Sequence, residues 1–169
     1  ALALASSPLV PHAQVAAPAS PAPTSASDPA TAALAATLPV DAAVRTGRLP
    51  NGVRYFLRQN ARPAKRVSMR LAVNVGSLQE EPDQRGLAHF LEHMAFNGTE
   101  NFKPGELVSF LESIGARFGP HVNASTSFDE TIYMLDMPTD RPGYVDRGML
   151  VLHDFAAGLS LLPAEVEKE

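Results

Sequence analysis

The first 38 residues constrain the fold most, because they contain almost no charge and no apolar pattern that could form a buried face. Alanine, proline and serine dominate this stretch, and such a composition is typical of disordered segments. We therefore expect residues 1–38 to be disordered and residues 39–169 to form the folded domain.

We interpret the same N-terminal stretch as the end of a signal peptide followed by a linker. Its first residues are apolar, and Val15-Ala16-Ala17 offers small residues for a cleavage site. A plain disordered tail is the alternative, because no positively charged region precedes the apolar residues. The chain begins without Met and stops within a helical pattern at PAEVEKE. We therefore expect a part of a longer, exported protein.

Composition excludes several kinds of site. The chain has no cysteine, so disulfides, thiolate metal ligands and a cysteine nucleophile are excluded. The net charge is −4 and the pI is about 5.7, so we expect no nucleic-acid partner. No later apolar run approaches the ~18 residues that a membrane-spanning helix needs, so we expect no membrane span.

Apolar periodicity after residue 38 changes between strand and helix patterns. Alternation predicts strands at 53–57, 67–75 and 131–136, the first of them after an Asn51-Gly52 turn. Apolar residues three and four apart predict helices near residue 86, at 107–114 and at 145–159, and a last helix begins at Pro163. This mixed order indicates an α+β fold.

Residues 89–93 read HFLEH and give the strongest chemical signal in the chain. At 100° per residue, Glu92 and His93 lie about 60° and 40° to either side of His89, on one helix face. The apolar residues of this segment fall on the opposite face: Leu87, Phe90, Leu91 and Met94. Two imidazoles at this spacing can bind one Zn²⁺, and Glu92 can then take a proton from an activated water. Two histidines that are merely neighbours on a helix are the alternative.

The sequence around this motif resembles the M16 family of zinc metallopeptidases, which includes pitrilysin, insulin-degrading enzyme and the mitochondrial processing peptidase. HxxEH is the inverted form of the HExxH zinc motif, and here it stands within RGLAHFLEHMAFNGT at 85–99. FLESIG at 110–115 and NASTSFDET at 123–131 extend the resemblance, which runs from about residue 49 to 169. It implies an α+β domain in which an antiparallel sheet carries helices on one face.

The resemblance also implies roles for four residues of the site. His89 and His93 match the two zinc histidines, and Glu92 matches the general base. A plain count along the chain places the family's third ligand, a glutamate, at Glu169. However, this chain has extra residues around 117–121 relative to shorter members, so we interpret Glu169 as the supporting glutamate. The third ligand is then expected about two helical turns further on, beyond residue 169.

Substrate and partners follow from the same resemblance. The segment with Asn123, Ala124 and Ser125 matches an edge strand beside which the family lays an extended substrate, held by main-chain hydrogen bonds. We expect peptides or unfolded polypeptides as substrates, and a second M16-like half in the same chain or in a separate subunit. Zn²⁺ is the expected cofactor, and the periplasm the expected location.

Two other interpretations of the HxxEH motif imply different functions. S-ribosylhomocysteine lyase also contains HxxEH, but its third ligand is a cysteine, which this chain lacks. A non-catalytic M16-like half that only binds or supports its partner is the stronger alternative, and the intact His89, Glu92 and His93 argue against it. We therefore predict a zinc-dependent endopeptidase whose activity is absent from the 169-residue polypeptide alone.

Overall fold

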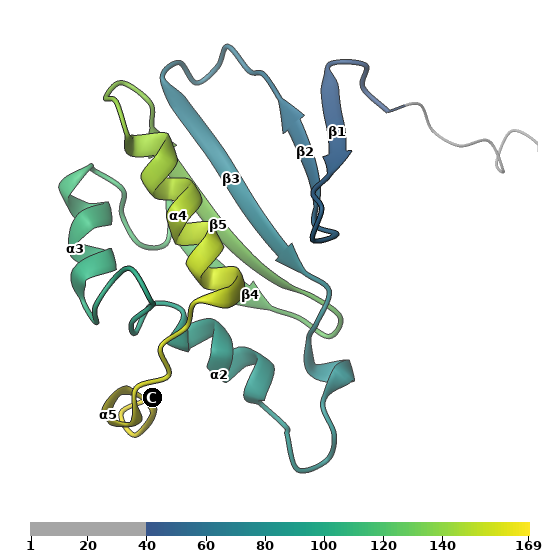
Figure 1. Cartoon of the computed structure of the whole chain (residues 1–169), viewed down its shortest axis with the longest axis vertical. Coiled ribbons are helices and arrows are strands. Elements are labelled where there is room, and N and C mark those ends of the chain that lie inside the picture. The colour runs from purple at the N-terminus through teal and green to yellow at the C-terminus, as the bar shows by residue number, and fades with distance from the viewer. Residues whose placement is uncertain (1–39) are drawn as a thin grey trace, which may run out of the picture. The chain divides into compact units, whose positions relative to one another are not determined.

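The computed structural model describes residues 40–169 (Figure 1), which divide between Leu57 and Arg58 into two units. The predictions for residues 1–38, disorder and the end of a signal peptide, lie outside the described residues. None of the helices in the described range is both long and apolar enough to cross a membrane.

A two-stranded hairpin is formed by β1 (Val44–Arg48) and β2 (Arg54–Arg58). In its turn, the Leu49 N–H donates to the Val53 carbonyl oxygen at 2.8 Å. Gly52 has a φ of 93°, a conformation that glycine adopts without strain. The predicted strand at 53–57 and its turn are confirmed. β1 was missed, because VRTGR contains no apolar alternation.

The second unit is built on a three-stranded antiparallel sheet. β3 (Arg66–Val73) and β4 (Val122–Thr126) both pair with β5 (Thr131–Pro138), which gives the strand order β3-β5-β4. Thr126 lies opposite Thr131 at the end of the β4–β5 hairpin. Among the described residues β4 is therefore an edge strand, as the resemblance implies.

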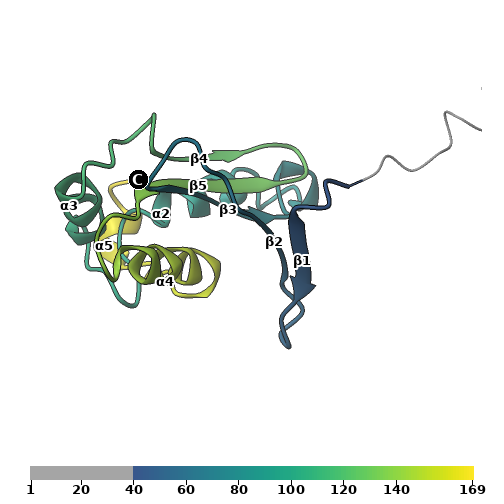
Figure 2. The same ribbon diagram turned by 90° about the horizontal axis from the view of Figure 1, so that it is seen from above.

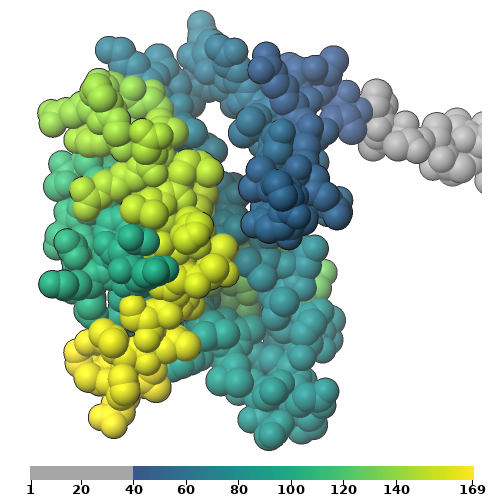
Figure 3. All heavy atoms as spheres, in the orientation of Figure 1, coloured from purple at the N-terminus to yellow at the C-terminus, as the bar shows by residue number. Residues whose placement is uncertain are grey.

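Helices cover one face of this sheet. Along β5, every second residue from Thr131 to Met137 is buried, and the residues between them are only partly covered. α2 (Leu87–Met94) and α4 (Tyr144–Ala157) both reach the buried face, because Thr131 and Tyr133 line an apolar cavity together with residues of both helices. Figure 2 shows α4 along the sheet, and in Figure 3 its side chains cover much of the sheet from the front.

The packing of α4 on the sheet is close at Gly148. A Cβ at this position would meet the far ends of the Met69 and Met137 side chains, which would have to shift to admit it. Met69 belongs to β3 and Met137 to β5, so the contact ties the helix to two strands at the centre of the core.

Three further helices complete the second unit, namely η1 (Ser77–Gln79), α3 (Glu106–Ser113) and α5 (Pro163–Val166). The helices predicted near residue 86, at 107–114 and after Pro142 are confirmed. β3 ends two residues earlier than predicted, because the chain bends into η1. The predicted α+β class, an antiparallel sheet with helices on one face, is confirmed.

Candidate metal centre and catalytic site

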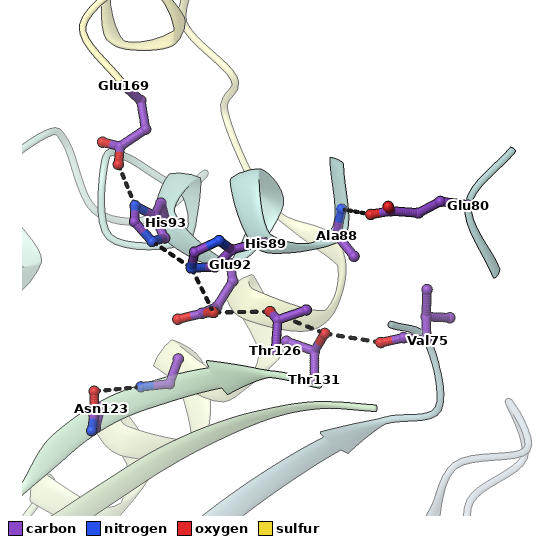
Figure 4. A network of polar contacts seen from close by, with 11 residues as sticks. Val75, Glu80, Ala88, His89, Glu92, His93, Asn123, Thr126, Thr131 and Glu169 are labelled. Carbon is purple, nitrogen blue, oxygen red and sulfur yellow. Dashed lines mark hydrogen bonds and ion pairs between the residues drawn. The ribbon is translucent and has the colours of Figure 1, made fainter. Parts of the chain in front are cut away.

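The two histidines of α2 point their ring nitrogens at each other (Figure 4). Nε2 of His93 is 3.0 Å from Nε2 of His89, and the rings meet edge to face with centroids 4.5 Å apart. The side chains of His89 and His93 are 65% and 45% exposed. Both nitrogens are therefore accessible to a ligand that they could share.

This nitrogen pair fits zinc in donor type and spacing. Two nitrogens that lie ~2.0–2.1 Å from one tetrahedral ion are about 3.3 Å apart, close to the 3.0 Å between the two Nε2 atoms. Within residues 40–169, no group of three or more His, Cys, Asp or Glu side chains is arranged to hold a metal ion. A zinc ion at His89 and His93 would therefore need a further ligand.

Glu92 lies between α2 and β4 and is only 7% exposed. Its Oε2 accepts a hydrogen bond of 2.8 Å from the Thr126 hydroxyl and lies 3.9 Å from Nε2 of His89. The Thr131 hydroxyl donates to the Val75 carbonyl oxygen at 2.9 Å and is 3.4 Å from Oγ1 of Thr126. The carboxylate is the nearer and charged acceptor, so the Thr126 proton points to Glu92. The helical spacing of residues 89–93 alone does not predict the contact between Glu92 and Thr126.

Burial along α2 differs from the prediction in one respect. Leu87 and Leu91, which the helical pattern assigns to the packed face, are 48% and 40% exposed. Glu92 and Met94 are the buried residues of the helix, and the bond from Thr126 shows that β4 covers the side on which Glu92 lies. Burial, together with the negative charge of Glu92, raises the pKa of Tyr133 to about 12.

Glu169 contacts the opposite ring nitrogen of His93. Its Oε1 is paired with Nδ1 of His93, and its Oε2 accepts a hydrogen bond of 2.8 Å from Nδ2 of Asn97. These bonds to His93 and Asn97 hold the pKa of the Glu169 carboxyl below its usual value. A carboxylate at Nδ1 orients the ring and leaves Nε2 free for a metal. Asn97 was not singled out in the sequence.

Glu80 lies outside the HFLEH motif and caps the N-terminus of α2, the helix that carries the motif. The two carboxylate oxygens of Glu80 accept the N–H groups of Gly86 and Ala88, both at 2.8 Å. These backbone bonds lower the pKa of Glu80. Sequence reasoning missed this cap, because the partners are six and eight residues away, outside the local pattern of N-cap residues.

One pocket brings the site residues of α2, β4 and the C-terminal residue together. It is lined by Glu92, His93, Phe96, Asn97, Phe118, Asn123, Ala124 and Glu169. Of the three residues expected to bind substrate, Asn123 and Ala124 line this pocket, whereas Ser125 does not and is exposed. The rings of Phe96 and Phe118 meet edge to face at 5.2 Å and form an apolar wall.

Comparison with known proteins agrees with this fold. Residues 55–169 match the model of the family described as Insulinase (Peptidase family M16). The chain is 46% identical over 123 residues to a zinc protease PQQL-like protein of Arabidopsis thaliana, covering 73% of this chain and 13% of that protein. It is 40% identical over 136 residues to the probable zinc protease PqqL of Escherichia coli (strain K12), covering 80% and 15%.

The structure is also similar to that of the first half of the periplasmic protease PqqL from Escherichia coli. The TM-score is 0.75 at 40% identity, over 79% of this chain and 29% of that one. Fold and site together define an α+β domain with an HxxEH helix against an edge strand. The chain belongs to the M16, or insulinase, peptidase family. It spans only 13% and 15% of the lengths of the two curated relatives above.

Proposed function

We propose that this chain is the part of a catalytic domain that supplies two metal ligands and the general base of a zinc-dependent endopeptidase. One observation carries the proposal. His93, the buried Glu92 and two residues of the edge strand β4 line a single pocket, and Nε2 of His89 is 3.0 Å from Nε2 of His93. A peptide in that pocket would lie beside the base and His93.

The residues of α2 would act as follows. His89 and His93 would hold zinc through their Nε2 atoms, and Glu169 would orient His93 through Nδ1. The third ligand would be a glutamate about two helical turns after Glu169. Zinc in such a site lowers the pKa of a water to ~7 and polarises the peptide carbonyl. Glu92 would take the proton from the attacking water.

The proposal also includes a substrate class, a partner and a cellular location. We expect extended peptides or unfolded polypeptides, because main-chain pairing along an edge strand tolerates many sequences. We also expect a second M16-like half, which the two-part division of the Escherichia coli protease PqqL supports. Export to the periplasm is supported by the periplasmic location stated for that protease.

The test uses the full-length protein, its Glu92→Gln variant and the control Glu112→Gln, an exposed residue of α3. We expect about one zinc per chain by metal analysis and cleavage of an unstructured peptide by mass spectrometry. Glu92→Gln should keep the zinc and lose activity by roughly 10²–10⁴-fold, the usual contribution of a general base. Wild-type protein without zinc and without cleavage would instead indicate the non-catalytic binding half.

A further inference from the structure

The residues of β4 alternate between bonding to β5 and facing away from it. The Asp136 N–H donates to the His121 carbonyl oxygen at 2.7 Å. At the other end, the Ser127 N–H donates to the Glu130 carbonyl oxygen at 2.8 Å. In an antiparallel ladder, the residues between such pairs direct their N–H and C=O groups to the outer edge. With this register those residues are Val122, Ala124 and Thr126.

The loop before β4 occupies the outer backbone groups of Val122. The Val122 N–H donates to the Arg117 carbonyl oxygen at 3.2 Å, and its own carbonyl oxygen accepts the Gly119 N–H at 2.9 Å. Phe118 thereby forms a parallel bridge with Val122. Both outer groups of Val122 are occupied by the backbone of this loop, so an incoming peptide cannot pair there.

Helix η1 forms hydrogen bonds with the backbone just after the opposite end of β4. The Ser77 N–H donates to the Ser127 carbonyl oxygen at 3.1 Å, and the Leu78 N–H donates to the Phe128 carbonyl oxygen at 2.8 Å. Gly76 permits this approach, because a Cβ there would collide with the backbone of Ser127 and Phe128. The chain therefore turns toward β5 directly after Thr126 and is held there by η1, so no outer pairing position follows Thr126.

Ala124 and Thr126 are the two outer positions of β4 between Val122 and the turn after the strand. The Ala124 N–H is held by Oδ1 of the exposed Asn123 at 3.0 Å, a side chain that can turn away. Across residues 40–169, no backbone group bonds the Ala124 carbonyl or either outer group of Thr126. This short stretch lies beside the site, because Ala124 lines the pocket of His93 and the Thr126 hydroxyl binds Glu92 (Figure 4).

We infer that β4 offers an extended peptide two main-chain pairing positions, Ala124 and Thr126. The loop at 117–121 sets this limit at one end, and the β4–β5 turn, held by η1, sets it at the other. The inference rests on the proposed function, because it takes the peptide to lie along β4. The peptide makes up to four hydrogen bonds, two of them from its own N–H groups to the carbonyls of Ala124 and Thr126. Substrate recognition by β4 then depends on about three residues of main chain around the cleaved bond.

An N-methyl scan of a peptide tests this limit. The probe is an unstructured fluorescent octapeptide that the full-length wild-type protein cleaves at one bond. Copies that each carry one N-methylated amide are bound to full-length Glu92→Gln and followed by fluorescence anisotropy. N-methylation removes one donor, so we expect about tenfold weaker binding at two positions, two residues apart. Alanine substitution at those positions, which keeps the amide, is the matched control and should change binding less.

Two outcomes of the scan would overturn the inference. Three or more sensitive amides at a spacing of two residues would mean that β4 pairs beyond Ala124 and Thr126. No sensitive amide would mean that the peptide main chain does not pair with β4. Neither outcome touches the proposed peptidase activity, which is judged separately by cleavage of the unmodified peptide and its loss in Glu92→Gln.

Deletion of residues 118–120 tests what sets the limit. The deletion removes the Gly119 donor and frees Val122, so a third sensitive amide is expected at the same spacing. An unchanged pattern in a deletion variant that keeps its zinc and its melting temperature would contradict the role of the loop. If the deletion prevents folding, the scan on the undeleted protein still decides whether the peptide pairs at two positions.

Discussion

Thr126 is the residue through which the sheet holds the side chain of Glu92. Its hydroxyl donates to Oε2 at 2.8 Å, while Oε1 has no such donor from β4. A carboxylate fixed at one oxygen presents the other in a defined direction, and a general base needs such a direction toward the water it deprotonates. For the general base that we propose at Glu92, Thr126 would therefore be a positioning residue, and its backbone lies on the strand that we propose binds the peptide.

Replacement of Thr126 by valine should slow the chemical step in the full-length protein. Valine keeps the shape and removes the hydroxyl, so we expect kcat to fall about tenfold, because a hydrogen bond to a charged group contributes about 1.5–3 kcal/mol. KM and zinc content should stay close to wild type. Steady-state kinetics on the octapeptide and metal analysis measure these three quantities.

Two further variants separate positioning from a general loss of structure. Thr126→Ser restores the hydroxyl and should recover most of kcat. Thr139→Val makes the same change at an exposed residue just after β5 and should have no effect. Wild-type kcat in Thr126→Val, or a serine variant as slow as the valine variant, would show that the contact with Glu92 does not position the base.

At the scale of elements, α2 is fixed at both ends by side chains from elsewhere. Glu80 binds its first turn, and Asp154 of α4 binds the loop that follows it. Oδ2 of Asp154 accepts the Thr99 hydroxyl at 2.7 Å and the Asn101 N–H at 3.0 Å. Asp154 is fully buried, so these bonds hold the loop where water cannot replace them.

Asp154→Asn should destabilise the protein at neutral pH. The substitution places an amide donor among groups that already donate, so we expect a loss of about 2 kcal/mol in the free energy of unfolding. Chemical denaturation of the full-length protein at pH 7 measures it. Asp140→Asn, at an exposed position after β5, is the control and should stay within ~0.5 kcal/mol of wild type.

The same residue gives an acid dependence with a definite sign. Burial raises the pKa of Asp154, but hydrogen bonds from Thr99, Asn101 and His153 outweigh burial and lower it overall. Because the folded-state pKa is below the unfolded value of ~3.9, the stabilisation is present above that value. It is lost as the pH falls through the folded-state pKa. The difference between wild type and Asp154→Asn should therefore shrink on acidification below pH ~4, and a constant difference would contradict this account.

At the scale of the whole molecule, the described residues contain two of the ligands that we propose for zinc. His89 and His93 form a nitrogen pair, and Glu169 is paired with Nδ1 of His93 rather than facing the two Nε2 atoms. The chain spans 13% and 15% of the two curated relatives described above. The zinc centre that we propose therefore needs a third ligand besides His89 and His93.

The 169-residue polypeptide alone should bind zinc weakly and cleave no peptide. Loss of even an outer contact weakens zinc binding 10–100-fold, so without a third ligand we expect an affinity at least about 100-fold below that of the full-length protein. Titration calorimetry and the octapeptide assay measure both properties. Robust cleavage by the short polypeptide, abolished by Glu92→Gln, would contradict this prediction and return Glu169 to consideration as the third ligand.

The sequence by itself determined the features that depend on local spacing. Alternation over residues 131–136 and the helical pattern of residues 107–114 predicted β5 and α3, because side-chain direction repeats every 2 or 3.6 residues. The spacing of HFLEH likewise placed His89, Glu92 and His93 on one side of α2, and its resemblance to the M16 family agreed with the comparisons. The roles of these three residues stay a prediction that the experiments above test.

Only the tertiary structure decided which groups surround that motif. Thr126 meets Glu92 across 34 residues, and Glu169 meets His93 across 76. The closure of β4 at Val122 depends on backbone hydrogen bonds made by a loop. Such contacts follow from how elements pack and where a strand ends, and packing has no period along the chain. The sequence therefore predicted the helix that carries the site, while the tertiary structure alone placed the groups that hold Glu92 and leave β4 open at two positions.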